Sequence, residues 1–396
     1  MPDFDVIILG AGAAGMMAGI EAGKRGRKVL VVDHARDPGE KIRISGGGRC
    51  NFTNINATHQ LGRERFLSSN PRFALSPLSR YTPEMFIARV KKQGIAFHEK
   101  TLGQLFCDGP ATQIVAMLTN DLRAAGAAIW TGRQVGSVER AGDEFDVMIG
   151  DGRVTASSLV VATGGKSIPK MGATGLAYDI ARQFGLKVTE TRPALVPLTF
   201  EPGALEQLKP LAGVSANAIV GHGKTQFEEA LLFTHRGLSG PAILQISSYW
   251  REGDTISVNL LPGEDALELF RAARQTTPKL HLQTVLSEKL PKRLAQLLGD
   301  MFNQPGMVGD LSDKKLAVAA EQVSRWTLKP VGSEGYRTAE VTLGGIDTTG
   351  LDAKTMMARQ VPGLFFVGEA VDVTGWLGGY NFQWAWASGW TAGQAA

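Results

Sequence analysis

The sequence contains very few cysteines and no long apolar run. Of its 396 residues only Cys50 and Cys107 are cysteines, and their spacing matches no metal-binding pattern. A disulfide framework is therefore excluded, we expect no bound metal, and a reducing cytoplasm is the expected location. No stretch approaches the ~18 apolar residues that a membrane-spanning helix needs, so we expect a soluble protein without a membrane partner.

The net charge of the chain is small, but an excess of positive charge is concentrated in one segment. The formal net charge is only +4, from 42 Lys and Arg against 38 Asp and Glu. Residues 41–100 alone carry 11 Lys or Arg and three Glu, which gives this segment an excess of +8. A solvated basic face is the more ordinary interpretation, and a surface that binds a polyanion is the alternative.

Glycine is the residue in excess. The chain has 48 glycines, about 12% of its residues, against a usual ~7%. They gather in short runs, at residues 46–48, 164–165 and 378–379, instead of spreading as low-complexity sequence. Such runs are typical of backbone that approaches a ligand closely.

The first residues of the chain predict a β-α-β unit. Residues 4–9 are an apolar, β-rich run, residues 13–25 carry small and apolar side chains at helical spacing, and residues 28–33 (KVLVVD) are a second apolar run. The turn between the first strand and the helix is GAGAAG, a GxGxxG motif. In this motif Gly10 permits the tight turn, Gly12 lets the backbone approach a pyrophosphate, and the third glycine allows close helix–strand packing.

A carboxylate completes a predicted dinucleotide site. Asp33 ends the second strand 18 residues after Gly15, where a carboxylate hydrogen-bonds the adenosine ribose hydroxyls. A merely structural turn is the alternative interpretation. Strand, helix and spaced acid together favour the dinucleotide, although they do not choose between NAD and FAD.

The C-terminal segment favours FAD. Residues 364–372 (LFFVGEAVD) are an apolar strand that ends in a glycine and acids, and an acid so placed can bind ribityl hydroxyls, which FAD has and NAD lacks. Residues 378–382 (GGYNF) then open a helix through about Gln394, whose first amides can face the flavin pyrimidine edge. A surface turn before an aromatic packing helix is the alternative.

Residues 41–54 (KIRISGGGRCNFTN) are the most unusual segment. Three consecutive glycines with flanking Ser, Arg and Asn predict a nest of hydrogen-bond donors suited to a pyrophosphate and to flavin carbonyls. The segment lacks the GK[ST] ending of a P-loop. A further glycine turn follows a strand at residues 162–165 (ATGG), and we predict a second cofactor contact there.

The rest of the chain predicts an α/β protein with an interrupted cofactor domain. Residues 128–161 alternate as a β-meander, and an amphipathic helical pattern covers residues 280–302. The predicted domains are a Rossmann-like cofactor domain at residues 1–191 and 331–396, an inserted β subdomain at 192–263 and a helical subdomain at 264–330.

Four segments, SGGGRCNFTN, VVATGG, EVTLGG and GGYNFQWAWASG, together resemble the HI0933-like flavoprotein family of the two-dinucleotide-binding-domain superfamily. The resemblance runs from end to end. It implies an FAD domain with an inserted β-barrel and a helical domain. It also implies activities as diverse as bile-acid double-bond reduction, aminoacetone oxidation and reduction of a ribosomal RNA uridine to dihydrouridine. Asp33 stands where many members have Glu, and Cys107 where relatives usually have Pro.

The predicted FAD site gathers these motifs. Cys50, directly after the glycines, is the candidate acid or thiol near the flavin, with packing as the more ordinary role. His235 is a candidate substrate contact, although a lone histidine is more often structural. The residues expected to bind FAD are Gly10, Gly12, Ala13, Ala14, Gly15, Asp33, His34, Lys41, Ser45, Gly46, Gly47, Gly48, Arg49, Asn51, Val135, Thr163, Gly164, Gly368, Glu369, Asp372, Gly379, Asn381 and Phe382.

The sequence thus predicts an FAD-dependent oxidoreductase that reduces or oxidises an activated C=C, C=N or amine of a small-molecule substrate. No second GxGxxG is present, so a donor such as NAD(P)H would dock transiently over the flavin. Two alternatives stay open. One is reduction of a uridine in ribosomal RNA, which the basic segment favours, and the other is a flavin-binding sensor without turnover.

Overall fold

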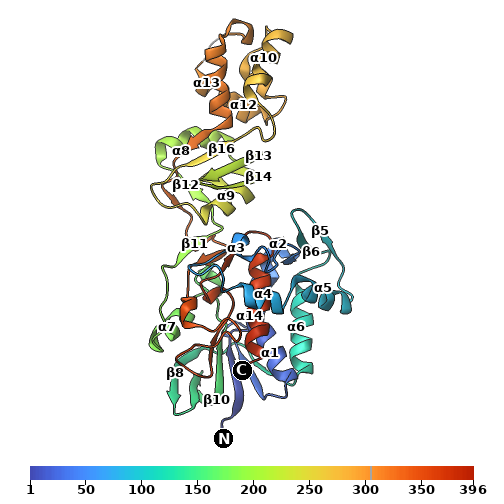
Figure 1. The fold of residues 1–396 in the computed structure, drawn as a ribbon, viewed down its shortest axis with the longest axis vertical. Helices are drawn as coiled ribbons and strands as arrows, with labels where there is room; N and C mark the ends of the chain where they lie inside the picture. Colours follow the sequence, from blue (N-terminus) through green and yellow to red (C-terminus); the bar gives the residue numbers. More distant parts are fainter. Residues whose placement is uncertain (304–305) are drawn as a thin grey trace. The chain divides into compact units, whose positions relative to one another are not determined.

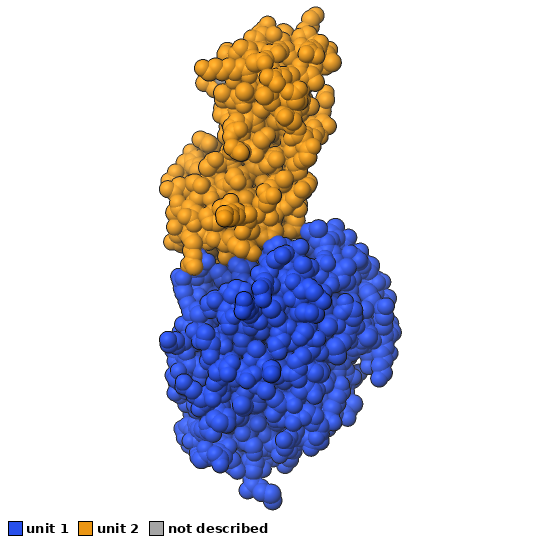
Figure 2. Space-filling view, in the orientation of Figure 1, with its two compact units in different colours: residues 1–192, 341–396 blue, residues 193–340 orange. Residues whose placement is uncertain are grey.

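The computed structural model describes residues 1–303 and 306–396 (Figure 1). Within it the chain divides into two compact units: unit 1, Met1–Arg192 with Val341–Ala396, and unit 2, Pro193–Glu340 (Figure 2). Unit 1 is therefore built from both ends of the chain, and it contains every residue that the sequence predicts to bind FAD. The finer division into three domains stays a prediction.

Unit 1 is organised around a sheet with the order β7-β2-β1-β10-β9-β8, in which β20 also pairs with β10. The pairs β1–β2, β2–β7, β1–β10 and β10–β20 are parallel, and β8, β9 and β10 form an antiparallel meander. The predicted α/β class, with its β-α-β unit and meander, is confirmed. The bounds are β1 Phe4–Leu9, β2 Val29–Val32, β7 Ala128–Trp130, β8 Val135–Ala141, β9 Glu144–Ile149, β10 Gly152–Val161 and β20 Leu364–Phe366.

The first and last long helices of unit 1 pack against each other. Figure 1 shows α1 (Ala13–Lys24) and α14 (Tyr380–Gly393) side by side. Their backbones approach closely, because a Cβ on Gly389 would lie 2.3 Å from the Ala14 carbonyl oxygen and one on Gly393 would lie 2.5 Å from that of Ala18. The C-terminal segment is thereby fixed beside the GxGxxG helix.

Shorter elements fill the rest of unit 1. The strands β5 and β6 form a hairpin that the sequence pattern does not predict, since β5 spans only three residues. The bounds are α2 Glu40–Gly48, β3 Asn51–Asn54, α3 Gly62–Arg65, β4 Phe66–Leu67, α4 Leu75–Arg80, α5 Pro83–Lys92, β5 Phe97–Glu99, β6 Gln104–Cys107, α6 Thr112–Ala124, α7 Leu176–Gln183, β19 Val341–Leu343 and β21 Thr374–Gly375.

Unit 2 contains a seven-stranded sheet with the order β17-β16-β13-β14-β15-β12-β18 and a group of helices. Neighbouring strands of this sheet are antiparallel. The bounds are β12 Leu198–Thr199, α8 Pro202–Leu208, β13 Ser215–His222, β14 Thr225–Thr234, β15 Gly237–Ser239, α9 Pro241–Ser247, β16 Ile256–Asn259, α10 Ala266–Thr276, α11 Leu282–Leu286, α12 Lys292–Phe302, α13 Asp313–Ser324, β17 Trp326–Leu328 and β18 Gly332–Ser333.

The prediction of one helical segment over residues 280–302 is wrong, because the structure has two helices there. The structure divides it into α11, which ends at Leu286, and α12, which begins after Pro291. Pro291 precedes the first turn of α12 with an extended ψ of 132°, where its missing N–H costs no helical hydrogen bond. In the part of the chain that the structure describes, no helix has the length and apolar character needed to cross a membrane.

Candidate cofactor site

The three glycines of the GxGxxG turn have three different surroundings. Gly10 has a φ of +105°, and a Cβ there would lie 2.5 Å from the Ala162 carbonyl oxygen. A Cβ on Gly15 would lie 1.9 Å from the Gly10 carbonyl oxygen, so α1 can pack on β1 only with glycine at this position. A Cβ on Gly12 would meet no heavy atom of another part of the chain within 4 Å. Gly12 is therefore the glycine that borders open space, where a ligand can approach the start of α1.

Asp33 is held beside this turn. Its carboxylate accepts hydrogen bonds from the Ala11 amide at 2.6 Å and the Ala35 amide at 2.8 Å. His34 is half-exposed, with Nδ1 3.3 Å from Asp33 Oδ1. The Arg133 amide donates to the Asp33 carbonyl at 3.0 Å, which brings the start of β8 at Val135 to the same place. An acid at the end of β2, next to the glycine turn, is positioned to bind ribose hydroxyls.

Two further glycine turns lie next to the first. Register pairs Leu9 with Val161 and Val161 with Phe366, so the chain leaves β1, β10 and β20 at neighbouring points on the carboxyl edge of the sheet. After β10, Gly164 has a φ of +74° and, like Gly12, borders open space. The adjacent Thr163 hydroxyl is buried and has no hydrogen-bond partner within the described residues. In open parallel sheets this edge is where ligands bind.

The turn after β20 is clamped by the last helix. The Gly368 amide donates to Ser388 Oγ at 3.0 Å, and Trp384 Nε1 donates to the Gly368 carbonyl at 2.9 Å. Gly368 has a φ of +68°, and a Cβ there would lie 3.0 Å from that of Ala14. The GxGxxG helix and the C-terminal strand therefore meet at this glycine.

The predicted glycine nest is a run of three glycines with left-handed backbone conformation at the end of α2. The φ angles of Gly46, Gly47 and Gly48 are +57°, +66° and +84°, which side chains larger than glycine rarely adopt. Gly47 borders open space, whereas a Cβ on Gly46 would lie 2.8 Å from the Phe106 ring. Ser45 Oγ donates to the Ile42 carbonyl at 2.8 Å, so this hydroxyl supports the helix end. Successive amides in such conformations can converge on an anion.

Two of the four family segments, residues 45–54 (SGGGRCNFTN) and residues 378–389 (GGYNFQWAWASG), are hydrogen-bonded to each other. We call them the two signature segments. Thr53 Oγ1 donates to Gln383 Oε1 at 2.8 Å, and Trp386 Nε1 donates to the Phe52 carbonyl at 2.8 Å. Asn54 Nδ2 donates to the Gly378 carbonyl at 2.8 Å. The strand that follows the nest thus docks on the start of α14, and the two motifs form one structural unit.

At the start of α14, the predicted side chains make contacts within the fold. The Asn381 amide group bonds the Gly375 N–H at 2.8 Å and its carbonyl at 2.9 Å. The Phe382 ring stacks on Trp386 at 5.6 Å between centroids. A Cβ on Gly379 would lie 2.4 Å from the Thr53 carbonyl carbon and oxygen, and no side chain caps the helix there. Glycine at this position therefore allows α14 to approach β3 closely, and its contact with FAD stays a prediction.

The two predicted acids of the C-terminal segment have different environments. Asp372 is buried and accepts from the Ser69 amide at 3.0 Å and the Ser69 hydroxyl at 2.5 Å, which ties it to the fold. Glu369 is partly exposed and binds Lys41 Nζ at 2.7 Å and Ser167 Oγ at 2.6 Å. Lys41 also contacts Ser167, at 2.6 Å, so a lysine, a serine and a glutamate form one network. The sequence did not indicate Ser167, because its partners are more than 100 residues away.

The Cys50 thiol is fully buried, and the structure favours packing over catalysis for it. Burial raises the pKa of Cys50 to about 12, and burial raises that of Cys107 to about 11. A thiol of this kind stays protonated and out of contact with solvent at neutral pH. His235 lies exposed in the turn between β14 and β15 of unit 2. A catalytic role for either residue stays a prediction.

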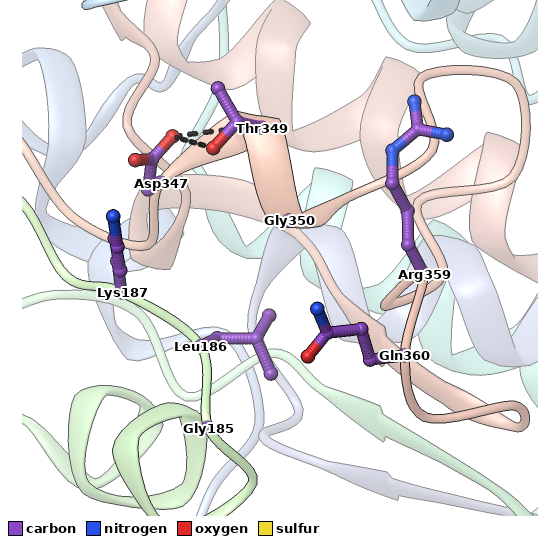
Figure 3. A pocket seen from close by; sticks show the side chains of 8 residues that line it. All are labelled: Gly185, Leu186, Lys187, Asp347, Thr349, Gly350, Arg359 and Gln360. Atoms are coloured by element: carbon purple, nitrogen blue, oxygen red, sulfur yellow. Dashed lines mark hydrogen bonds between the residues drawn. The ribbon is translucent and has the colours of Figure 1, made fainter.

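A separate pocket of about 210 Å³ lies elsewhere on unit 1 (Figure 3). It contains none of the residues predicted to bind FAD. Asp347 in this pocket accepts from the Thr349 amide at 2.9 Å and from its hydroxyl at 2.8 Å. The lining residues are Gly185, Leu186, Lys187, Asp347, Thr349, Gly350, Arg359 and Gln360.

The residues on the carboxyl edge of the sheet fit FAD. Open space at Gly12, Gly47 and Gly164 allows a long ligand to lie against backbone, and the unpaired Thr163 hydroxyl is available to bond it. Asp33 would supply the ribose acid at one end, and the start of α14, which no side chain caps, would supply amides at the other. Among the described residues no group of three or more His, Cys, Asp or Glu side chains is arranged to hold a metal ion.

Comparison with known proteins gives matches over the whole chain. The family model described as "HI0933-like protein Rossmann domain" matches residues 4–395. A ribosomal RNA dihydrouridine synthase of Escherichia coli (strain K12) is 49% identical over 400 residues, which cover 100% of this chain and 98% of that protein. A 3-dehydro-bile acid delta(4,6)-reductase of Clostridium scindens is 27% identical, with 98% of each chain covered. A solved 3-ketosteroid delta1-dehydrogenase from Sterolibacterium denitrificans has the same fold, with a TM-score of 0.54, 14% identity and 98% of each chain covered.

Proposed function

The chain belongs to the HI0933-like family of FAD-dependent oxidoreductases, and from this premise we propose that it reduces a uridine in ribosomal RNA to dihydrouridine. The observation that carries the proposal is the 49% identity, over the whole of this chain, to a protein named as a ribosomal RNA dihydrouridine synthase. The basic excess of residues 41–100 supports a polyanionic substrate. The relatives are named as enzymes, which favours an enzyme over a flavin-binding sensor without turnover.

The reaction adds two hydrogens across the C5=C6 bond of uracil, one as a hydride and one as a proton. When bound, FAD supplies the hydride chemistry. We propose NAD(P)H as the source of the electrons, since the chain has one GxGxxG and a donor would share the flavin site.

The chain's own residues would bind and orient the cofactor. The amides at the start of α1 and in the turn at Gly164 would bind the pyrophosphate, and Asp33 would bind ribose hydroxyls. The Lys41–Glu369 pair would fix the turn after β20. The amides that begin α14 would favour negative charge on the reduced ring, because they lie at the positive end of the helix dipole.

A second candidate is reduction of a double bond in a small molecule. It is supported by the 27% identity to the bile acid reductase. The two candidates differ in one property, since a neutral small substrate needs no cationic surface and its turnover would depend little on salt.

The test compares ribosomal RNA nucleosides from cells with and without the gene by mass spectrometry. We expect dihydrouridine to be lost on deletion and restored by the wild-type gene but not by Gly12→Val. Purified protein with NAD(P)H should then convert ribosomal RNA from the deletion strain. Equal dihydrouridine with and without the gene, together with no conversion in vitro, would exclude the proposal.

A further inference from the structure

The eleven cations of residues 41–100 fall into two groups in the structure. Five are used within the fold, by an acid, a carbonyl or an aromatic ring: Lys41 with Glu369 (2.7 Å), Arg89 with Asp121 (2.9 Å), Arg43 with the Pro38 carbonyl (3.2 Å), Arg65 on the Trp376 ring (4.2 Å) and Arg80 on the Trp390 ring (5.1 Å). The other six are exposed and form no ion pair within the described residues, although Lys91 and Lys100 also lie over rings of the β5–β6 hairpin: Arg49, Arg63, Arg72, Lys91, Lys92 and Lys100.

Four of these six gather at the β5–β6 hairpin. Lys91 Nζ lies 6.0 Å from the centre of the Phe97 ring on β5, and Lys100 Nζ lies 5.4 Å from that of Phe106 on β6. Lys92 follows Lys91 at the end of α5, which Figure 1 shows beside the hairpin. The Arg49 carbonyl accepts from the Cys107 amide at 3.0 Å, which brings Arg49 to β6. Phe97 and Lys91 lie on one face of the hairpin, and His98, Phe106 and Lys100 lie on the other, because His98 is paired with Phe106. We name the cations on and beside the two faces, Arg49, Lys91, Lys92 and Lys100, together with these three rings, the hairpin surface.

The hairpin surface is continuous with the predicted flavin nest. Lys100 lies over the Phe106 ring, and a Cβ on Gly46 would lie 2.8 Å from the same ring. On the same strand, Gln104 lies 2.5 Å from the position of a Cβ on Gly378. One face of the hairpin therefore closes on both glycine turns, while its cations are exposed to solvent.

The negative groups near the hairpin surface do not cancel it. Glu99 is exposed on β5, and Asp108 is occupied by His98 at a distance of 2.6 Å. Residues 97–108 contain only these two acids, against the four cations of the hairpin surface. Because the whole chain carries +4 and residues 41–100 carry +8, all other residues together carry −4. Residues 41–100, which supply all four cations of the hairpin surface, are the positive part of an otherwise acidic chain.

We infer that the hairpin surface binds the phosphate backbone of the RNA substrate, while the target base extends to the flavin site. This inference rests on the proposed function. Cations without acid partners release counterions when they bind phosphates, which gives salt-dependent affinity. The ring of His98 stacks on Phe106 with centroids 6.3 Å apart and Lys100 lies over Phe106, and aromatic rings beside a cation suit unpaired bases.

The test removes three charges from the hairpin surface and three from the opposite edge of the sheet. The hairpin variant is Lys91→Gln/Lys92→Gln/Lys100→Gln, and it leaves Arg49 intact because Arg49 belongs to the predicted nest. The control is Arg27→Gln/Lys28→Gln/Arg123→Gln, which lies at the ends of α1 and α6, where a Cβ on Gly23 would be 2.5 Å from the Ala125 carbonyl oxygen. Lys28 matches Lys100 of the hairpin variant, since its Nζ lies over an aromatic ring too, 5.0 Å from the centre of the Phe4 ring.

Binding is measured with protein-free ribosomal RNA from the deletion strain over a series of salt concentrations. For the hairpin variant we expect at least tenfold weaker binding at low salt. Its slope of log affinity against log salt should be smaller by about 2, from three contacts at ~0.7 each. KM for RNA should rise with kcat unchanged, and FAD content should equal that of the control. The control should bind within about twofold of the wild type, since its cations lie away from the glycine turns.

Two outcomes overturn the inference and are distinguishable. Wild-type protein that forms no dihydrouridine refutes the proposed function, and the inference with it. Wild-type protein that forms dihydrouridine, with a hairpin variant that binds RNA as tightly and with the same salt slope as the control, refutes the hairpin surface alone.

Discussion

Gly12→Val should separate cofactor binding from folding. Gly12 has φ −81° and ψ −170°, an extended conformation that valine adopts without strain. A Cβ there meets no heavy atom of another part of the chain within 4 Å. The loss for folding is then that of a poorer N-cap, about 1 kcal/mol. The same side chain would occupy the space in which a pyrophosphate approaches the helix, and we expect at least a hundredfold loss of FAD affinity, about 2.7 kcal/mol.

Gly15→Val is the matched control, one helical turn away. Its Cβ would lie 1.9 Å from the Gly10 carbonyl oxygen, and backbone cannot yield cheaply, so the cost to folding should exceed ~3 kcal/mol. Thermal unfolding is measured on FAD-free protein, because bound cofactor stabilises the folded state by mass action. FAD retention is measured by visible absorbance after gel filtration. The reasoning fails if FAD-free Gly12→Val unfolds as early as Gly15→Val, or if Gly12→Val retains FAD.

The elements that the sequence predicted are those with local signals. Alternating or continuous apolar residues mark β1, β2 and β10, and the structure confirms these strands together with α1 and α14. The hairpin of β5 and β6 was missed because a strand of three residues has no measurable period. The break before α12 has a local signal in Pro291, which interrupts the helix although the apolar periodicity continues across residues 280–302.

The motifs of the site were visible in the sequence, but the use of each side chain was not. Glycine turns after strands predict where backbone meets a ligand, and Gly12 and Gly164 do border open space. Side chains such as those of Asp372 and Asn381 also suggested ligand contacts. In the structure they bond Ser69 and Gly375, because a buried polar group needs a partner wherever the chain supplies one. Ser69 lies 303 residues from Asp372, and a partner at that distance leaves no pattern in a single sequence, whereas Gly375 lies only six residues before Asn381.

Three further predictions concern the cofactor, the buried thiol and the contact between the signature motifs. Purified protein should release FAD on denaturation, and chromatography that shows FMN, or no flavin after FAD supplementation, would contradict the assigned site. Cys50→Ala should retain FAD and be less alkali-sensitive. Burial raises the pKa of the folded Cys50 thiol to about 12, against 9.0 in the unfolded chain. Above pH 9 the thiol ionises in the unfolded chain but not in the folded protein, so the free energy of unfolding falls. Between pH 8 and 10.5 urea unfolding of the wild type should lose about 2 kcal/mol more than Cys50→Ala, and equal losses would contradict this. Gln383→Leu leaves the Thr53 hydroxyl and the Tyr81 carbonyl, both bonded at 2.8 Å, without their partner. At about 1–3 kcal/mol for each group, unfolding should become about 2–6 kcal/mol easier, and FAD retention should fall because the nest and the start of α14 lose register. Gln394→Leu, directly after the same helix and with one bond of 3.0 Å to Glu21, should cost under about 1 kcal/mol and keep FAD. Adding Thr53→Val to Gln383→Leu removes one of the two unpaired groups, so the double variant should be more stable than the sum of the single losses predicts. Strict additivity would show that Thr53 and Gln383 are not coupled, and that the two signature segments are joined by other contacts.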